Sequence, residues 1–124
     1  MSGRVVHFEI PYDDGDRARR FYSETFGWQL QEMPGMEYTL VVSGPSGERG
    51  PSEPGFINGG LMERAQPVGG PVLVVDVDDI EAALEEVESL GGTTVSTKQA
   101  VGEMGFAAYF NDSEGNLMGL WQNA

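Results

Sequence analysis

The feature that most restricts the fold of this chain is an order of elements that occurs twice. An alternating apolar segment near the N-terminus is followed by an acidic cluster and an amphipathic segment that ends at a glycine. A shift of about 65 residues aligns His7 with Val72, Asp14 with Asp79, Ala18 with Ala83 and Gly27 with Gly92. The sequence therefore predicts a unit of strand, helix and three further strands, present twice.

The two predicted units have matching elements. In the first unit we expect strands at 5–11, 28–33, 38–43 and 56–62, with a helix between the carboxylates of 13–16 and Gly27. In the second we expect strands at 72–77, 94–98, 106–110 and 117–122, and a helix at 80–90. Residues 44–54 are polar and rich in glycine and proline, which predicts a mobile loop without regular elements. We thus expect one domain, 1–124, with modules at about 1–64 and 71–124 and a linker at about 65–70.

Charge and composition restrict the partners. The chain has 20 acidic and 7 basic residues, which gives a net charge of −13. Such a surface repels nucleic acid and anionic lipid headgroups, so we expect neither as a partner. With no cysteine, disulfides and thiolate metal sites are excluded. The N-terminal residues have no signal-peptide pattern and no apolar stretch is long enough to span a membrane, which together predict a cytoplasmic protein.

Several site types are excluded by the residues present. One histidine does not allow sites that need two, and no glycine-rich phosphate loop or nucleophile elbow occurs. The acidic clusters at 13–16 and 111–116 lack the spacing of a calcium loop, and we expect them to serve as a helix cap and a turn.

Five segments carry a resemblance to a known family. They are His-Phe-Glu-Ile-Pro at 7–11, Arg-Ala-Arg-Arg-Phe-Tyr-Ser-Glu-Thr-Phe-Gly-Trp at 17–28, Gly-Gly-Leu-Met at 59–62, Val-Asp-Val-Asp-Asp at 75–79, and Asp-Ser-Glu-Gly-Asn-Leu-Met-Gly-Leu-Trp-Gln at 112–122. In this order they resemble the vicinal oxygen chelate superfamily, which includes glyoxalase I, extradiol dioxygenases, epimerases and bleomycin-resistance proteins. The resemblance implies an α+β fold in which two βαβββ modules pair their mixed sheets into a cup-shaped barrel, with the helices outside.

The resemblance also implies a divalent metal in the cup, held by four positions. His7 matches the first position. The other three fall on Val72, Gly119 and the segment 59–62, none of which supplies a metal ligand. Glu9 shares a strand face with His7, but two donors are too few for a tight site. The residues therefore favour a cup that has lost its metal, and the cofactor is left open.

Strand alternation predicts the walls of the cup. Leu117 and Trp121 share the inward parity of Gly119. Met62 and Tyr109 are further candidates for ligand contact, together with Trp28, Tyr38 and Phe106.

Three functions remain open from the sequence. The first is a small-molecule binding protein, favouring cations because of the net charge. The second is a lyase, isomerase or dioxygenase type of enzyme on an oxygenated substrate, either metal-assisted or using His7 and Glu9 as an acid–base pair. The third is a purely structural domain. A module of about 60 residues buries its sheet face poorly, and we expect the modules to pair in a homodimer.

Overall fold

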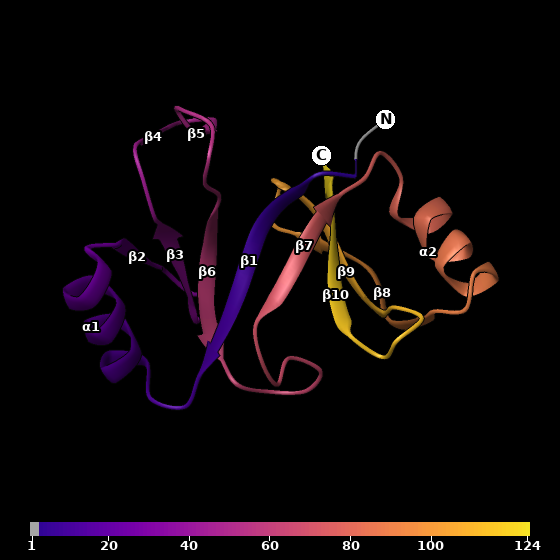
Figure 1. Ribbon diagram of the computed structural model, residues 1–124, viewed down its shortest axis with the longest axis horizontal. Helices are drawn as coiled ribbons and strands as arrows, with labels where there is room; N and C mark the ends of the chain where they lie inside the picture. Colours follow the sequence, from indigo (N-terminus) through magenta and orange to yellow (C-terminus); the bar gives the residue numbers. More distant parts are fainter. Residues whose placement is uncertain (1–2) are drawn as a thin grey trace. The chain divides into compact units, whose positions relative to one another are not determined.

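The computed structural model describes residues 3–124, and their contacts divide into two compact units. The N-terminal unit comprises His7–Pro71, and the C-terminal unit comprises residues 3–6 and 72–124. Both units combine a helix with a mixed sheet, which confirms the α+β class (Figure 1).

The two units have the same strand order. The N-terminal sheet runs β2-β3-β6-β1, formed by β1 (Val5–Tyr12), β2 (Gln29–Met33), β3 (Tyr38–Val42) and β6 (Asn58–Glu63), with α1 (Gly15–Phe26) between β1 and β2. The C-terminal sheet runs β8-β9-β10-β7, formed by β7 (Val72–Asp76), β8 (Thr93–Val101), β9 (Gly105–Asn111) and β10 (Leu117–Asn123), with α2 (Ile80–Ser89) between β7 and β8. In each sheet the first strand pairs in parallel with the last strand of its unit. The predicted duplication is confirmed.

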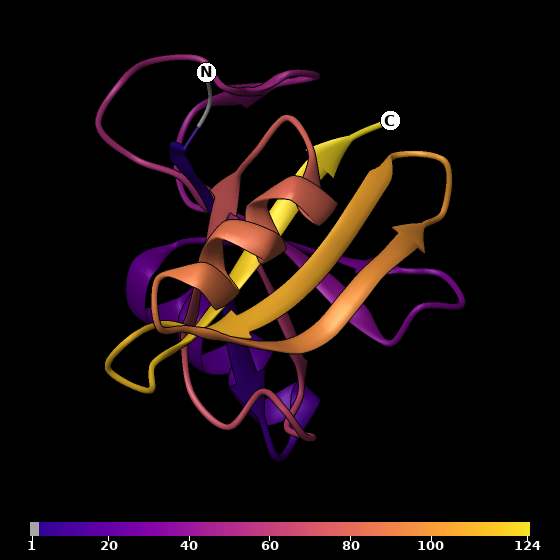
Figure 2. The same ribbon diagram turned by 90° about the vertical axis from the view of Figure 1, so that its right-hand side faces the viewer.

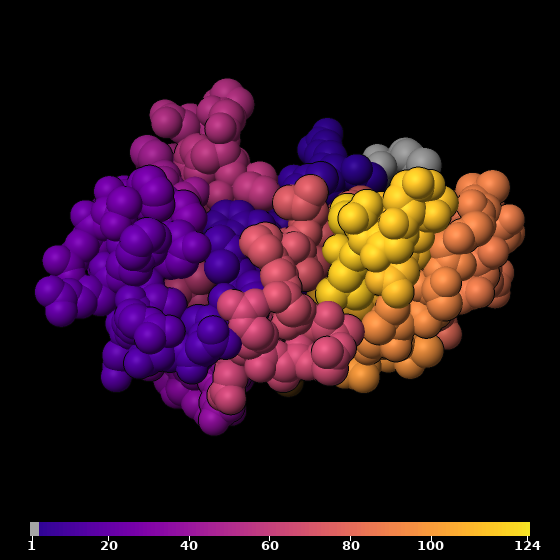
Figure 3. Space-filling view, turned by 60° about the horizontal axis from the view of Figure 1, so that its bottom comes forward, coloured from indigo at the N-terminus to yellow at the C-terminus, as the bar shows by residue number. Residues whose placement is uncertain are grey.

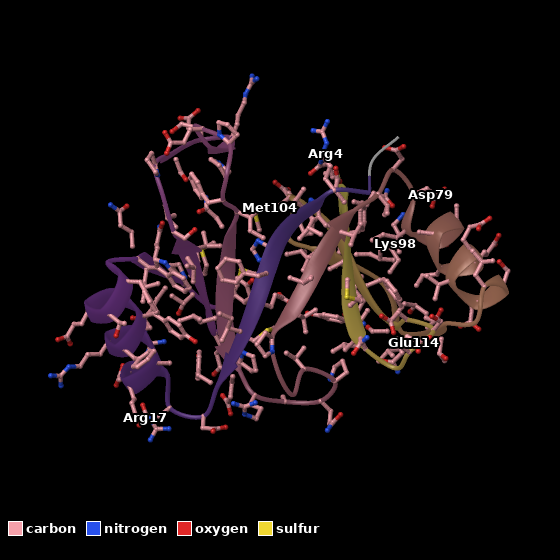
Figure 4. All side chains as sticks on the ribbon, in the orientation of Figure 1. Arg4, Arg17, Asp79, Lys98, Met104 and Glu114 are labelled. Atoms are coloured by element: carbon pink, nitrogen blue, oxygen red, sulfur yellow. The ribbon has the colours of Figure 1, made fainter. Side chains whose placement is uncertain are left out.

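Both helices begin at the aspartates that the sequence indicates. The Asp14 carboxylate accepts a hydrogen bond from the Arg17 backbone N–H, and Asp79 accepts one from Ala82. These bonds satisfy N–H groups that have no partner within the helix. Figure 4 labels Asp79 at the start of α2. Helix α1 ends at Gly27, whose φ of 71° lies in the left-handed region.

Each helix packs against one face of the sheet in its own unit. In the N-terminal unit Val41, Leu61 and Thr39 are buried, and Arg19 of α1 donates to Thr39. In the C-terminal unit, α2 lies across the sheet (Figure 2), and the buried residues that form its core with the strands are Ile80, Leu84, Ala108 and Leu120. Since side chains alternate along a strand, the intervening residues point to the opposite sheet face.

The segment 44–54 differs from the prediction. It contains a small hairpin, β4 (Ser46–Gly47) and β5 (Gly50–Pro51). Ser52 donates to the Pro45 carbonyl through both its backbone N–H and its hydroxyl, and Phe56 packs on Gly44. Two-residue strands show no alternation, so the sequence gives no signal for them.

The remaining differences are at element ends. Strand β8 is longer than expected, reaching Val101 beyond the register shifts that follow Thr94 and Ser96. The segment between β6 and β7, residues 64–71, lies on the surface (Figure 3), with Val68 as its buried residue. Within residues 3–124, no helix has the length and apolar character needed to cross a membrane.

Candidate functional site

The two polar residues of β1 lie on the sheet face away from α1. Phe8, between them, packs on Trp28, which stacks on Tyr22 of α1 at 4.9 Å. His7 and Glu9 alternate with Phe8 and so point to the opposite face. Both side chains are half-buried. The structure therefore confirms that these two residues share one face of the sheet.

Tyr38 joins His7 and Glu9 into one hydrogen-bonded set. Its hydroxyl oxygen lies 2.7 Å from His7 Nε2 and donates to Glu9 Oε2 at 3.2 Å. The histidine and tyrosine rings are nearly parallel, with centroids 6.4 Å apart. Three half-buried polar groups on rigid strands are thus connected on the helix-free face of the N-terminal sheet.

Gly60 makes this connection geometrically feasible. Strand β6 lies between β3 and β1, and Gly60 is paired with Glu9 on one side and Leu40 on the other. A Cβ atom at Gly60 would overlap the Tyr38 ring and hydroxyl. The absence of a side chain lets the tyrosine lie across β6 and reach β1.

Burial determines the charge of His7. It lowers the pKa of His7 below the ordinary value of 6.5, while the nearby Glu9 carboxylate opposes this by raising the pKa. Desolvation is the larger effect, and it disfavours the imidazolium. His7 is therefore neutral near pH 7 and available as a hydrogen-bond acceptor or a base.

The other predicted ligand contacts are distributed over both units. Leu117, Tyr109 and Trp121 lie in the C-terminal unit, on the sheet face that they share with Gly119 and away from α2. The Trp121 indole lies against Gly105, and its Nε1 donates to Asn123. Met62 belongs to the N-terminal unit, paired with Tyr38.

Two of the further aromatic candidates were wrong. Trp28 packs in the aromatic cluster with Phe8 and Tyr22, on the helix side of its sheet. Phe106 packs against the core beneath α2. Trp28 precedes β2, so strand alternation does not determine the direction of its side chain. For Phe106, an error of one residue in the expected alternation assigns the side chain to the wrong face of the sheet.

The donor set does not fit the metal that the fold family implies. Of the four implied positions only His7 carries a ligand, because valine and glycine have no donor atoms in their side chains. Within residues 3–124, no three His, Cys, Asp or Glu side chains are grouped closely enough to hold an ion. The Gln122 side chain of β10 is engaged at the start of α2, where its Oε1 accepts the Ile80 N–H.

The acidic clusters act as the cap and the turn that we expected. Asp14 caps α1, and Asp112 accepts the backbone N–H groups of Glu114 and Asn116. These hydrogen bonds lower the pKa of Asp112 and hold the turn before β10.

The sequence indicated the polar pair but not its connection. Tyr38 was one of several aromatic candidates, and nothing singled it out. The signal that was available is Gly60 within a predicted strand, because an internal glycine often marks a close approach of another group.

Comparisons with known proteins agree with this architecture. A family model described as bleomycin resistance protein-like N-terminal matches residues 4–44. A glyoxylase-like domain-containing protein of Didymella fabae is 31% identical over 119 residues, covering 94% of this chain and 91% of that protein. A probable lactoylglutathione lyase of Vibrio parahaemolyticus is 29% identical, covering 98% and 92%. The crystal structure of methylmalonyl-CoA epimerase from Mycobacterium tuberculosis aligns with a TM-score of 0.64 at 21% identity, covering 98% and 88%.

The fold, with two βαβββ units of the same strand order, defines the class of protein. Each unit of this chain has one helix and four main strands. The chain belongs to the vicinal oxygen chelate superfamily, among its glyoxalase-like members.

Proposed function

We propose that this protein binds a small organic molecule over the face that carries His7, Glu9 and Tyr38, without a tightly held metal. The observation that supports the proposal is the hydrogen-bonded set itself. A small-molecule site typically combines apolar walls with a few well-placed polar groups. Met62 on the same unit, and Leu117, Tyr109 and Trp121 on the other, are the apolar and aromatic residues that we assign to the walls.

We also propose that the two sheets pair to form a cup around the ligand, either within one chain or between two chains. It also includes a cytoplasmic location, which cell fractionation would test.

The ligand class that we propose is cationic. The net charge of −13 raises the local concentration of cations and lowers that of anions. Glu9 adds a carboxylate on the face in question, beside a neutral imidazole. Aromatic side chains such as Trp121 and Tyr109 supply faces that attract ammonium groups.

A thermal-shift experiment tests this function. The probes are benzylammonium, benzyl alcohol and benzoate, which share a ring and differ in charge. We expect benzylammonium to raise the unfolding temperature and benzoate to leave it unchanged. In Glu9→Gln, which keeps the shape of the side chain, the effect of benzylammonium should decrease while the stability without ligand changes little. Stabilisation by benzoate alone would contradict the charge argument, and a large loss of stability in Glu9→Gln would make Glu9 a structural residue.

A second candidate function is proton transfer on a small oxygenated substrate. The neutral state of His7 beside a carboxylate favours it, because such a pair can take and return a proton. The test is exchange of the C–H hydrogen for deuterium in α-hydroxy ketones, followed in heavy water. Exchange that disappears in His7→Ala would support an enzyme, whereas exchange unchanged in that variant would exclude His7 as the base.

Metal analysis of protein purified without chelators accompanies this test. We expect well below one equivalent of any divalent ion. Stoichiometric zinc, nickel, manganese or iron lost in His7→Ala would instead support a metal-assisted reaction.

A further inference from the structure

The hydrogen bonds around Tyr38 have a direction. A tyrosine hydroxyl carries one proton, and in this structure it donates to Glu9 Oε2. Because the Glu9 carboxylate can only accept, the tyrosine proton serves that contact, and the hydroxyl oxygen accepts from His7 Nε2 across the 2.7 Å contact in the tautomer that is protonated at Nε2. In this arrangement His7 donates to Tyr38, and Tyr38 donates to Glu9. A neutral histidine that donates through Nε2 has its lone pair on Nδ1.

Nδ1 is accessible in this arrangement. Among the described residues, none forms a hydrogen bond with Nδ1, and no side-chain nitrogen or oxygen of residues 3–124 is both buried and without a partner. Nδ1 is therefore not sealed inside the protein. It presents an acceptor on the face that also carries the Glu9 carboxylate.

The sheet places the tyrosine where it can impose this direction. Tyr38 begins β3, two strands away from β1, and spans the intervening β6 above Gly60. This position of the tyrosine ring requires a residue without a side chain at position 60, and residue 60 is a glycine. The Phe8 and Trp28 packing on the other side of β1 holds that strand in place.

We propose that Tyr38 is the positioning residue of the site: its hydroxyl holds His7 in the Nε2-protonated neutral form, so that Nδ1 accepts a hydrogen bond from an N–H or O–H group of the ligand. The ligand part of this statement rests on the proposed binding function. The requirement for a donor at Nδ1 restricts the proposed ligands to cations that also carry an N–H or O–H group. Primary and secondary ammonium groups meet this requirement, and quaternary ammonium groups do not.

Nitrogen NMR tests the tautomer directly. His7 is the one histidine of the chain, so its two ring-nitrogen signals need no assignment by mutation. In ligand-free protein at about pH 8, where the imidazole is neutral, we expect the Nε2-protonated pattern. In Tyr38→Phe, which keeps the ring and removes the hydroxyl, the two nitrogens should move towards the averaged values of a free imidazole.

Two further variants make the result specific. Tyr22→Phe removes a hydroxyl from a ring that packs on Trp28, and it should leave the histidine pattern unchanged. Glu9→Gln should relax the preference, because an amide can donate to Tyr38 as well as accept from it. A merely structural role of Tyr38 would lower the unfolding temperature without changing the tautomer. A wild-type Nδ1-protonated pattern, or an unchanged pattern in both Tyr38→Phe and Glu9→Gln, would overturn the proposal.

The ligand part has its own measurement. Benzylammonium should shift the Nδ1 signal more than the Nε2 signal, whereas benzyltrimethylammonium, which has no N–H donor, should not. A shift of equal size with both probes would overturn the donor requirement. If neither probe binds while the tautomer is as expected, the binding function fails and the positioning role of Tyr38 stands.

Discussion

At the scale of single residues, Gly60 and Tyr38 depend on each other. The tyrosine ring occupies the volume that a Cβ at position 60 would need. Gly60→Ala should therefore lower the free energy of unfolding by ~1–3 kcal/mol through overpacking.

The same substitution in a Tyr38→Ala background should cost much less, because the ring is gone. Urea denaturation of the four proteins in this cycle gives the coupling energy, which we expect at ~0.5–3 kcal/mol. A coupling energy near zero would show that the two residues do not compete for space.

The lowered pKa of His7 predicts a pH dependence of stability. In the unfolded chain the imidazole has its ordinary pKa of 6.5, and in the folded protein the pKa is lower. The unfolded state therefore binds the proton first as the pH falls. The stability associated with neutral His7 is fully present above pH 6.5 and is lost as the pH falls towards the folded pKa.

The comparison of wild type with His7→Gln measures this effect, because His7 is the one histidine of the chain and the variant has none. Urea denaturation across this range should show wild type losing stability relative to His7→Gln. A difference between the two proteins that is independent of pH, or that changes in the opposite direction, would contradict the lowered pKa.

At the scale of elements, the helix caps are local and testable. Asp79→Ala removes the acceptor for the Ala82 N–H at the start of α2 and should lower the free energy of unfolding by ~1 kcal/mol. Asp78→Ala is the matched control, because Asp78 is the exposed neighbouring aspartate. This substitution removes the same charge and leaves the Asp79 cap in place. Equal losses in the two variants would indicate a general charge effect instead.

The sequence predicted correctly those features of the fold that depend on residues close together in the chain, and it missed those that depend on distant strands. The helix starts depend on aspartates a few residues from the groups they bind, so Asp14 and Asp79 were identified correctly. The contact of Tyr38 with His7 joins strands that are 31 positions apart, and it depends on the order β3-β6-β1, which periodicity does not specify. The β4–β5 hairpin was missed because its strands are too short to alternate.

At the scale of the whole molecule, we expect a homodimer. Each unit has one sheet face without a helix of its own, and such faces carry half-buried aromatic residues such as Tyr38 and Trp121. Pairing between chains is a low-cost way to cover them. Light scattering should give about 27 kDa, twice the chain mass of 13.4 kDa.

Salt should strengthen the dimer, because each chain carries a charge of −13 and screening reduces the repulsion. A mass near 13 kDa at micromolar concentration in both low and high salt would contradict the dimer.

The repeated strand order has a consequence for how this protein evolved. At the shift of about 65 residues, His7 and Glu9 correspond to Val72 and Val74, which are 2% and 7% exposed. If both halves descend from one ancestral module, the copies have diverged in chemistry while keeping their architecture. One copy carries ionisable side chains, and the other carries buried hydrophobic side chains at the same positions. We therefore expect substitutions at equivalent sites of the two halves to act differently: a loss of polarity should matter at His7 and Glu9, and a change of volume at Val72 and Val74.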